Sequence, residues 1–505
     1  MTSERLFSFT PENGGRATLL FLLFLLAIYE LVSAGFNTFA IICFSPILVF
    51  YVIATFRYKM MTFWILCFIN YFIQWKNFPG GVPTSLPNEM LEIILIVLAI
   101  IDVKEAKFER TANLMLAMLM AWAGFCTLEV LNDSCGLGIQ VGAWYTGARM
   151  MAFQLLYAFL VYILYIITPK RLVQYLYVWG GLSLFAVFWV WKQKNLGFTD
   201  AENHWMNTIG YVTHIINGGT LIRYFSVFND AACFGINMAA TSVAFLVFGI
   251  TNKIRRLKLF YLITGAACFW ATFPSGTRTS IFCFFAGVML YIILSKSVKA
   301  AASVSIAFIL FVFMLVFTNI GNGNPQIRRM RSGFNKNDAS ANVRDINQAE
   351  MKKYLADAPW GIGVGIGYDN VPANNKFRRL STIPPDSEYV FIWVHTGVIG
   401  ITFFLITTAV MLIAACWIVL FRIKSPSLRG IGAGLCCAFV SIQLGGYANQ
   451  VLMQFPNCLL FYGGLSLVYA LPYFEDEWNE YEKGELEKEA EKKRLKLEKK
   501  RAKRV

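Results

Sequence analysis

Long apolar runs separated by short polar segments dominate this chain. Most runs hold roughly 17 to 25 residues, and a helix of that length can cross a hydrocarbon layer of about 30 Å. The runs predict helices because they are continuously apolar, whereas the strands of a membrane barrel alternate apolar and polar residues. We expect about fourteen spans. They lie near residues 17–34, 38–56, 61–75, 90–102, 112–132, 147–168, 172–191, 230–250, 258–273, 278–295, 299–318, 397–421, 428–445 and 455–472.

The polar segments divide the chain into four regions. These are a helical membrane region with about eleven spans, a large loop, a C-terminal membrane region and a charged tail, at residues 1–318, 319–387, 388–472 and 473–505. A second, shorter loop covers residues 192–229 within the first region. The tail alternates acidic and basic residues, and pairs such as Glu489 and Lys493 lie four residues apart. We therefore predict a solvated helix there.

The composition agrees with a membrane protein. In 505 residues, 57% are apolar, 16% aromatic and 15% charged, which excludes one aqueous core. No small-residue cleavage site follows the first apolar run, so we expect no cleavable signal peptide. The chain is predicted to be an all-α polytopic membrane protein.

Lysine and arginine in the short loops indicate the orientation, because such residues stay on the cytoplasmic side. They recur in alternate loops and are nearly missing from the others: Arg57, Lys59, Lys104, Lys107, Arg110, Lys170, Arg171, Lys253, Arg255, Arg256, Lys258, Lys296, Lys299, Arg422, Lys424 and Arg429. Both termini are then cytoplasmic, and the loops at residues 192–229 and 319–387 lie outside. The formal net charge of +15 is thus mostly topological and gives no argument for nucleic acid.

The cysteines, histidines and glycines lack the spacing of known metal-binding or nucleotide-binding motifs. All eleven cysteines except Cys135 fall in or beside the spans, and the three histidines lack neighbouring ligands. The stretch GIGVGIG, at residues 361–367, misses the GxGxxG spacing. We expect no disulfide, metal site, nucleotide fold or cofactor.

The large outer loop is unusually basic. It holds Arg328, Arg329, Arg331, Lys336, Arg344, Lys352, Lys353, Lys376, Arg378 and Arg379. Because the other outer loops carry almost no positive charge, this loop predicts a site for an anionic, phosphate-bearing substrate.

Two further arginines lie at outer membrane boundaries. Arg223 follows the shorter loop in LIRYFSVFND, where it either reaches a lipid phosphate or anchors the helix end by snorkelling. Arg278 lies in PSGTRTS, where it enters or borders the hydrocarbon region. A charge at that depth is costly unless it is paired or faces a wet cavity, so we expect a functional role over a purely structural cap.

The large loop predicts one helix of its own, over residues 340–358. Val343, Ile346, Met351 and Tyr354 share one face, and Pro359 stops the helix. Further on, Asp386 and Glu388 place two carboxylates at the outer membrane surface. Residues two apart do not share a helical face, so they are not expected to act as one dyad.

These regions, in this order, resemble the O-antigen ligase and polymerase superfamily of bacterial envelope glycosyltransferases. The resemblance covers residues 222–404 and rests on Arg223, Ser275 with Arg278, Arg344, Pro359 with Gly361 and Gly363, Asp386, and Gly397 with Gly400. One departure matters, because Asp386 and Ser387 stand where ligases of the family usually show His-Asn. His395 falls inside the following helix, where packing or water satisfies it more simply.

The resemblance implies a metal-independent enzyme with a GT-C-like fold in the bacterial inner membrane. It would move a glycan from undecaprenyl pyrophosphate to an acceptor hydroxyl, with Arg223, Arg278 and Arg344 holding the pyrophosphate. Arg278 would also act in catalysis, and Asp386, with Glu388 as the weaker candidate, would orient or deprotonate the acceptor. A chain-length regulator is a further candidate partner.

Three functions stay open. Polymerisation of O-antigen or other surface polysaccharide repeat units is favoured, since the ligase histidine is missing. Ligation of the glycan to lipid A core is the alternative. A flippase for lipid-linked oligosaccharide is a third, but transporters usually show internal repeats and charges at the bilayer midplane, and the sequence shows neither clearly.

Overall fold

The computed structural model describes residues 14–33, 50–51, 53–77, 85–216, 221–332 and 339–502. The chain divides into two compact units, residues 1–64 and 65–505. In the first, α1 (Gly14–Ser33) matches the first predicted span, and α3 (Lys59–Phe72) begins just before the unit ends. The predicted span at residues 38–56 lies mostly outside the described residues, as does Lys336.

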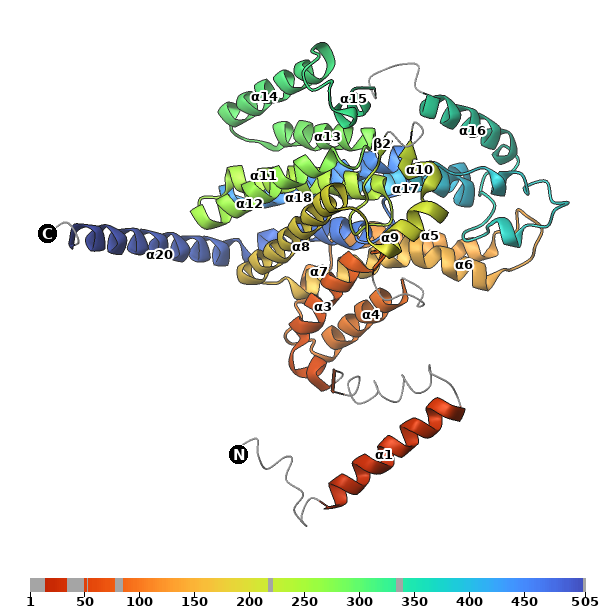
Figure 1. The fold of residues 1–505 in the computed structure, drawn as a ribbon, viewed down its shortest axis with the longest axis horizontal. Helices are drawn as coiled ribbons and strands as arrows, with labels where there is room; N and C mark the ends of the chain where they lie inside the picture. The colour runs from red at the N-terminus through yellow and green to blue at the C-terminus, as the bar shows by residue number, and fades with distance from the viewer. Residues whose placement is uncertain are drawn as a thin grey trace. The chain divides into compact units, whose positions relative to one another are not determined.

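The second unit is almost entirely helical, and Figure 1 shows its elements. In chain order they are α4 (Leu86–Ile101), η3 (Phe108–Arg110), α5 (Leu114–Leu128), η4 (Glu129–Leu131), α6 (Val141–Ala148), η5 (Arg149–Phe153), α7 (Gln154–Tyr165), α8 (Pro169–Leu196), α9 (Asp200–Thr208), α10 (Tyr211–His214), β1 (Ile215–Ile216), β2 (Leu221–Ile222), α11 (Ala231–Thr251), α12 (Arg255–Thr272), α13 (Arg278–Leu294), α14 (Val298–Phe317), α15 (Pro325–Ser332), α16 (Ala339–Leu355), η6 (Tyr368–Asn370), η7 (Leu380–Thr382), α17 (Glu388–Trp417), η8 (Ile418–Arg422), α18 (Pro426–Ala448), η9 (Cys458–Tyr462), α19 (Gly463–Ala470), η10 (Leu471–Phe474) and α20 (Glu475–Ala502).

The apolar runs are helices, which confirms an all-α membrane protein. Within the described residues, seven helical stretches are long and apolar enough to cross a membrane: Leu114–Leu131, Val141–Tyr165, Pro169–Leu196, Ala231–Thr251, Glu388–Arg422, Pro426–Ala448 and Cys458–Lys499. The apolar helices Lys59–Phe72, Arg278–Leu294 and Ala301–Met314 are shorter. The expected number of about fourteen spans is therefore not confirmed.

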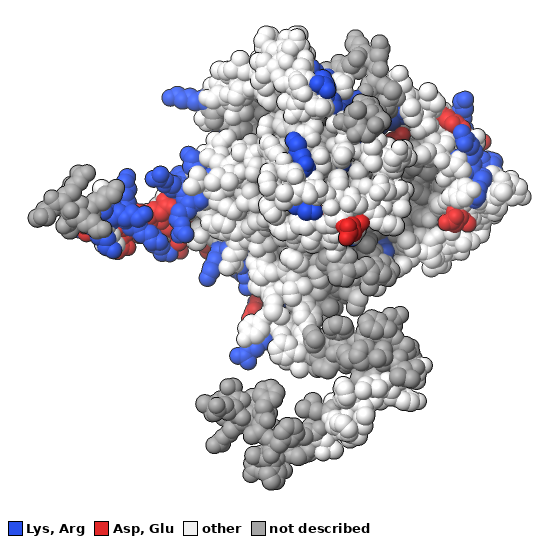
Figure 2. Space-filling model, viewed as in Figure 1, with Lys and Arg blue, Asp and Glu red and all other residues white. Residues whose placement is uncertain are grey.

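Helix α11 is the centre of the second unit and packs against α12, α13 and α18. Its residues are apolar or small all round, as expected of a helix surrounded by other helices. The neighbours approach closely because they carry small residues: a Cβ added at Gly434 of α18 would lie 2.5 Å from Phe248 of α11. Figure 2 shows a largely white surface over α8, α11 and α12, with charged side chains gathered on α20.

The predicted loop helix is present as α16, but only half of its apolar face is buried. Met351 is fully buried in a cluster with Leu355, Ile362 and other loop residues. Val343 and Ile346, on the first turns of the same face, are 54% and 66% exposed. The shorter loop, residues 192–229, also contains structure that its sequence pattern did not predict, namely α9, α10 and the antiparallel pair β1–β2.

The glycine-rich segment of the large loop, residues 361–367, is hydrogen-bonded to α17 beside a kink in that helix. We call this contact the joint. Gly397 has φ 65° and ψ −170°, which interrupts the helix and frees backbone groups. The loop uses them: the Ile362 N–H donates to the Val394 carbonyl (2.9 Å) and the Gly363 N–H to the His395 carbonyl (3.1 Å). This joint fixes the end of α16 against the first turns of α17.

His395 belongs to the same joint. Its side chain is buried, and its Nδ1 lies 3.1 Å from the Gly363 carbonyl, to which it donates. The simpler interpretation of this histidine, a helix residue satisfied by packing, is therefore supported.

The tail forms the predicted helix, α20, but its first half is docked rather than only solvated. Trp478 is fully buried and donates from Nε1 to Ser427 Oγ (2.9 Å). The carboxylate of Glu489 accepts the backbone N–H groups of Arg255 and Arg256, both at 3.2 Å, at the first turn of α12. Glu489 thus caps a neighbouring helix, where its negative charge meets the positive end of the helix dipole.

Candidate functional site

The sequence PSGTRTS forms the turn between α12 and α13. Ser275 Oγ donates to the Thr272 carbonyl (2.7 Å) and accepts the Thr277 N–H (3.1 Å), which closes the turn. Gly276 has φ +58°, a conformation that glycine adopts without strain. Arg278 is then the first residue of α13, so its guanidinium starts from the N-terminal end of a 17-residue helix.

Arg223 extends from the end of the β1–β2 hairpin toward this turn. Its guanidinium donates to the Ser275 carbonyl (3.2 Å), to Thr277 Oγ1 (2.9 Å) and to the Thr213 carbonyl (2.9 Å). These acceptors carry no net charge, so Arg223 supports the turn and keeps its positive charge uncompensated by them.

A third arginine reaches the same turn from α15. Arg329 Nε donates to the Gly276 carbonyl (2.6 Å). In return, the Arg278 guanidinium of α13 donates to Ser332 Oγ of α15 (3.4 Å). Helix α15 therefore covers the N-terminal end of α13. Sequence reasoning counted Arg329 among the basic loop residues but gave it no role; the run IRRMRS, with apolar residues flanking the arginine pair, was the available signal.

The electrostatics of Arg223 show how close these cations are. Burial, followed by the positive charges of Arg329, Arg278 and Arg344, lowers the pKa of its guanidinium to about 10, against the opposing effect of Asp230. We call Arg223, Arg278, Arg329 and Arg344 the arginine cluster. Cations held together in this way favour a multivalent anion such as a pyrophosphate.

The two carboxylates predicted to act on the acceptor have different surroundings. Asp386 is exposed, and its Oδ2 accepts from Asn347 Nδ2 at 3.3 Å. Asn347 lies three residues after Arg344 on α16, so Asp386 meets the helix face that carries this arginine. Glu388 is only 3% exposed, and it accepts the Leu452 N–H at 2.9 Å. The geometry therefore favours Asp386 for contact with a substrate, with Glu388 holding the backbone after α18.

The segment that follows α18 connects Asp386 with the arginine cluster. Asn449 Nδ2 donates to Thr279 Oγ1 (3.4 Å) at the start of α13. The next residue, Gln450, donates from Nε2 to the Pro385 carbonyl (2.7 Å), directly before Asp386. The starts of α13 and α17 are thus tied to one another through two consecutive residues.

A groove lies beside Asp386, between α16 and α17. Its volume is about 470 Å³, and its lining includes Lys352, Leu355, Ser387, Tyr389, Trp393 and Tyr447. Aromatic rings with a few polar groups are typical of sites that bind sugars or other partly apolar ligands.

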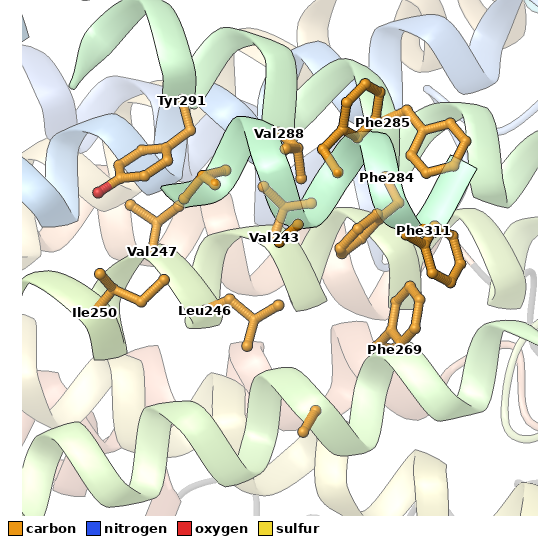
Figure 3. A pocket seen from close by; sticks show the side chains of 14 residues that line it. Val243, Leu246, Val247, Ile250, Phe269, Phe284, Phe285, Val288, Tyr291 and Phe311 are labelled. Carbon is orange, nitrogen blue, oxygen red and sulfur yellow. The ribbon is translucent and has the colours of Figure 1, made fainter. Parts of the chain in front are cut away.

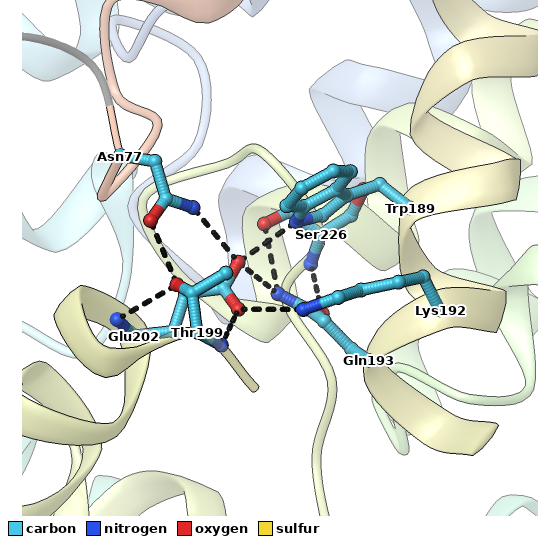
Figure 4. A network of polar contacts seen from close by, with 7 residues as sticks. All are labelled: Asn77, Trp189, Lys192, Gln193, Thr199, Glu202 and Ser226. Carbon is cyan, nitrogen blue, oxygen red and sulfur yellow. Dashed lines mark hydrogen bonds and ion pairs between the residues drawn. The ribbon is translucent and has the colours of Figure 1, made fainter. Parts of the chain in front are cut away.

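A buried polar network holds the segment that carries Arg223 (Figure 4). Its centre is Glu202, whose carboxylate accepts from Trp189 Nε1 (2.8 Å) and Gln193 Nε2 (2.9 Å) of α8. Gln193 also accepts the N–H of Ser226 (2.9 Å) and donates to its carbonyl (3.1 Å). Ser226 has φ 54° and lies three residues after Arg223, so this network fixes a strained backbone next to the arginine.

Glu202→Gln is expected to lower the free energy of unfolding by about 2 kcal/mol. The carboxylate only accepts hydrogen bonds, whereas the NH₂ group of an amide would face N–H groups that also donate. Thermal unfolding of the purified protein measures this change. The control is Asp200→Asn, in the exposed first turn of the same helix, which should stay close to wild type. Equal unfolding temperatures for the two variants would contradict the proposed importance of the network.

His214 supports the same hairpin from the other side. Its Nε2 accepts the Ala231 N–H (3.1 Å) at the first residue of α11, so the proton lies on Nδ1, which donates to Thr213 Oγ1 (2.7 Å). Burial, together with the charge of Arg223, lowers the pKa of the imidazole from 6.5 to about 3. The folded protein thus holds His214 neutral.

Acid should weaken this contact. The folded-state pKa lies below the unfolded value, so the stability is complete above pH 6.5 and is lost as the pH falls toward 3. Between pH 7.5 and pH 5 we expect a loss of about 2 kcal/mol from this residue. Unfolding measured across this range checks it: His214→Gln should flatten the pH dependence, whereas His204→Gln, at an exposed position of α9, should keep it. An unchanged dependence in His214→Gln would contradict the assignment.

Within the described residues, no group of three or more histidine, cysteine, aspartate or glutamate side chains could hold a metal ion.

Comparison with known proteins identifies one stretch of the chain. Residues 263–405 match the family model described as O-Antigen ligase. The matched stretch runs from α12 into α17 and contains Arg278, Arg329, Arg344 and Asp386, whereas Arg223 lies before it. No curated protein matches the chain. The family match agrees with a function of the O-antigen ligase and polymerase type, and over residues 263–405 it confirms the resemblance to the O-antigen ligase and polymerase superfamily.

Proposed function

We propose that this protein is an inner-membrane glycosyltransferase that moves a glycan from undecaprenyl pyrophosphate to an acceptor hydroxyl at the periplasmic face. The observation that carries the proposal is the arginine cluster at the N-terminal end of α13, three of whose four members lie within the stretch that matches the O-antigen ligase family. Both termini would then be cytoplasmic.

The arginine cluster would stabilise the leaving group. When the bond between the sugar and the pyrophosphate breaks, negative charge develops on the pyrophosphate oxygens. Guanidinium groups already in place lower the free energy of that charge without reorganising at the moment of reaction. The N-terminal end of α13 adds the positive end of its helix dipole.

Asp386 would act on the acceptor. The acceptor hydroxyl must lose a proton as it attacks the sugar, and an exposed carboxylate within hydrogen-bond reach can accept it. The groove between α16 and α17 lies next to this residue, and its aromatic lining suits the acceptor glycan. Donor and acceptor would then approach from the α13 side and the α17 side of the same site.

Asp386→Asn is expected to lower kcat by about 10² to 10³, because an amide cannot accept the acceptor proton. KM for the lipid-linked donor should change little, since the arginines hold the pyrophosphate. Initial rates of transfer with purified protein in lipid measure both constants. The control is Asp369→Asn, an exposed aspartate in η6 of the same loop, which should transfer at the wild-type rate. An unchanged kcat in Asp386→Asn would remove the assignment of the base.

Polymerisation of repeat units is the favoured form of the reaction. Asp386 and Ser387 occupy the place where ligases of the superfamily usually show His-Asn. The direct test is to incubate the protein in lipid with an undecaprenyl-pyrophosphate repeat unit and to separate the products by length. A ladder of products supports a polymerase, and one new product that needs lipid A core supports a ligase. Movement of the intact unit across the bilayer without transfer would instead support a flippase.

A further inference from the structure

An apolar slot opens among α11, α12, α13 and α14, and Figure 3 shows the side chains that line it. Its volume is about 360 Å³. Phenyl rings gather toward one end of the slot, from Phe269 of α12, Phe284 and Phe285 of α13 and Phe311 of α14. Phe308 of α14 joins them, with its ring centroid 5.0 Å from that of Phe285. The hydroxyl of Tyr291 is the one polar side-chain group among its lining residues. An apolar cavity of this kind excludes water and suits a hydrocarbon ligand.

The slot begins directly below the arginine cluster. Along α13, Phe284 follows Arg278 by six residues and Tyr291 follows it by thirteen, so the slot extends from roughly 9 Å to roughly 20 Å below the arginine. Helix α15 links the two sites, since Met330 is fully buried against Ile281 and Phe285 while the preceding residue, Arg329, bonds to Gly276. The anion-binding groups and the apolar slot thus share one short helix.

The side of the slot is open to the hydrocarbon layer. Ala266 and Ala307 line it and are both exposed, so small residues form part of its rim. Helix α14 packs against α13, while its opposite face, with Ile306, Ile309 and Leu310, is more than half exposed. A chain can therefore enter sideways from the bilayer.

We propose that this slot binds the polyprenyl chain of the lipid-linked donor, next to its pyrophosphate in the arginine cluster. The inference rests on the proposed function, and it deepens that proposal by locating the second half of the donor. A polyprenyl pyrophosphate joins an anionic head to an apolar chain, and the arginine cluster and the slot present the complementary surfaces in the same order. The slot would select donors by the length of their polyprenyl chain. It would also hold the bond between the glycan and the pyrophosphate at a fixed position along α13.

The test compares donors with long and short chains that carry the same glycan and pyrophosphate. Ala307→Trp and Ala266→Trp fill the slot from exposed positions, so both variants should fold. We expect each to lower the ratio of kcat/KM for the long donor to that for a short, farnesyl-linked donor by at least about tenfold, because hydrocarbon contacts are lost. The control is Ile293→Trp, which adds the same ring at a 68% exposed position of α13 outside the slot, and it should keep the wild-type ratio. An unchanged ratio in both slot variants would overturn the proposal.

Binding separates failure of the slot from failure of the proposed function. A polyprenyl pyrophosphate that carries a photoreactive diazirine on its chain should label α13 or α14, and Ala307→Trp should reduce that labelling. This result would support the slot even if the wild-type protein transferred no glycan, an outcome that would refute the proposed function alone. Equal labelling by a phospholipid with a diazirine on its acyl chain would show that the slot holds ordinary bilayer lipid, and would overturn the proposal.

Discussion

Arg329→Ala and Arg278→Ala are each expected to lower kcat/KM for glycan transfer by about 10² to 10³, while the protein still folds. Both guanidinium groups lie at the turn between α12 and α13, where Arg329 bonds to Gly276 and Arg278 to Ser332. Each would contact the leaving pyrophosphate, whose charge is largest in the transition state. Steady-state transfer with purified protein in lipid measures the loss. Because most of the stabilisation is gained in the transition state, kcat should fall more than KM rises.

The matched control is Arg328→Ala. Arg328 is the neighbour of Arg329 on α15, but it is exposed and its guanidinium donates to the Asn322 carbonyl within its own loop. Loss of the same positive charge one residue away should lower kcat/KM by less than about threefold, since exposed charges are largely screened. Equal losses in Arg328→Ala and Arg329→Ala would mean that the loop acts through its overall charge. Full activity in Arg278→Ala would refute the role of the arginine cluster in catalysis.

Gly397→Ala is expected to prevent correct folding of the large loop. A Cβ at this position would lie 1.9 Å from the Pro359 carbonyl oxygen, which is less than any real contact. The backbone conformation, with φ 65° and ψ −170°, is itself open almost only to glycine and costs another residue about 1 to 3 kcal/mol. Loop and helix must therefore separate, which detaches α16, with Arg344, and Asp386 from the other three arginines of the cluster. We expect a fall in unfolding temperature and complete loss of transfer.

Gly124→Ala is the matched control for this change. Gly124 lies within α5 and has no neighbouring atom within 4 Å of an added Cβ. Alanine is the better helix residue by about 1 kcal/mol, so this variant should be as stable as the wild type or slightly more stable. A Gly397→Ala protein that unfolds at the same temperature as Gly124→Ala would show that the joint contributes nothing to the fold.

Much of the helical framework could be predicted from single segments of sequence. Residues 230–250 and 278–295 were expected as spans, and α11 and α13 agree closely with them, because a long apolar run must satisfy its backbone hydrogen bonds internally in lipid. Helix α16 could be predicted for a related reason, from its periodic apolar residues and the proline after it. The exposure of Val343 and Ile346 could not be predicted, since burial depends on what packs against that face of the helix.

The candidate site was only partly predictable. Arg223 and Arg278 were singled out by their positions at membrane boundaries and by the resemblance, and Arg344 by the resemblance. The structure places the first two at one turn, with Arg344 close enough to affect Arg223. Arg329 was one of ten cations in the large loop, and the apolar residues that flank the arginine pair in IRRMRS were all that distinguished it. The roles of Glu202 and His214 could not be predicted either, because their hydrogen-bond partners come from α8 and α11.

The sequence by itself determined the membrane-spanning helical class, the basic character of the large loop and the order of the arginine and glycine motifs. These features depend only on the composition and spacing of residues within single segments of the chain. Only the tertiary structure decided that Arg329 reaches Gly276, that Glu388 turns inward to Leu452 while Asp386 stays exposed, and that an apolar slot lies below Arg278. Each of these depends on contacts between residues far apart in the chain, and their geometry is set by the packing of whole helices, which no local pattern encodes.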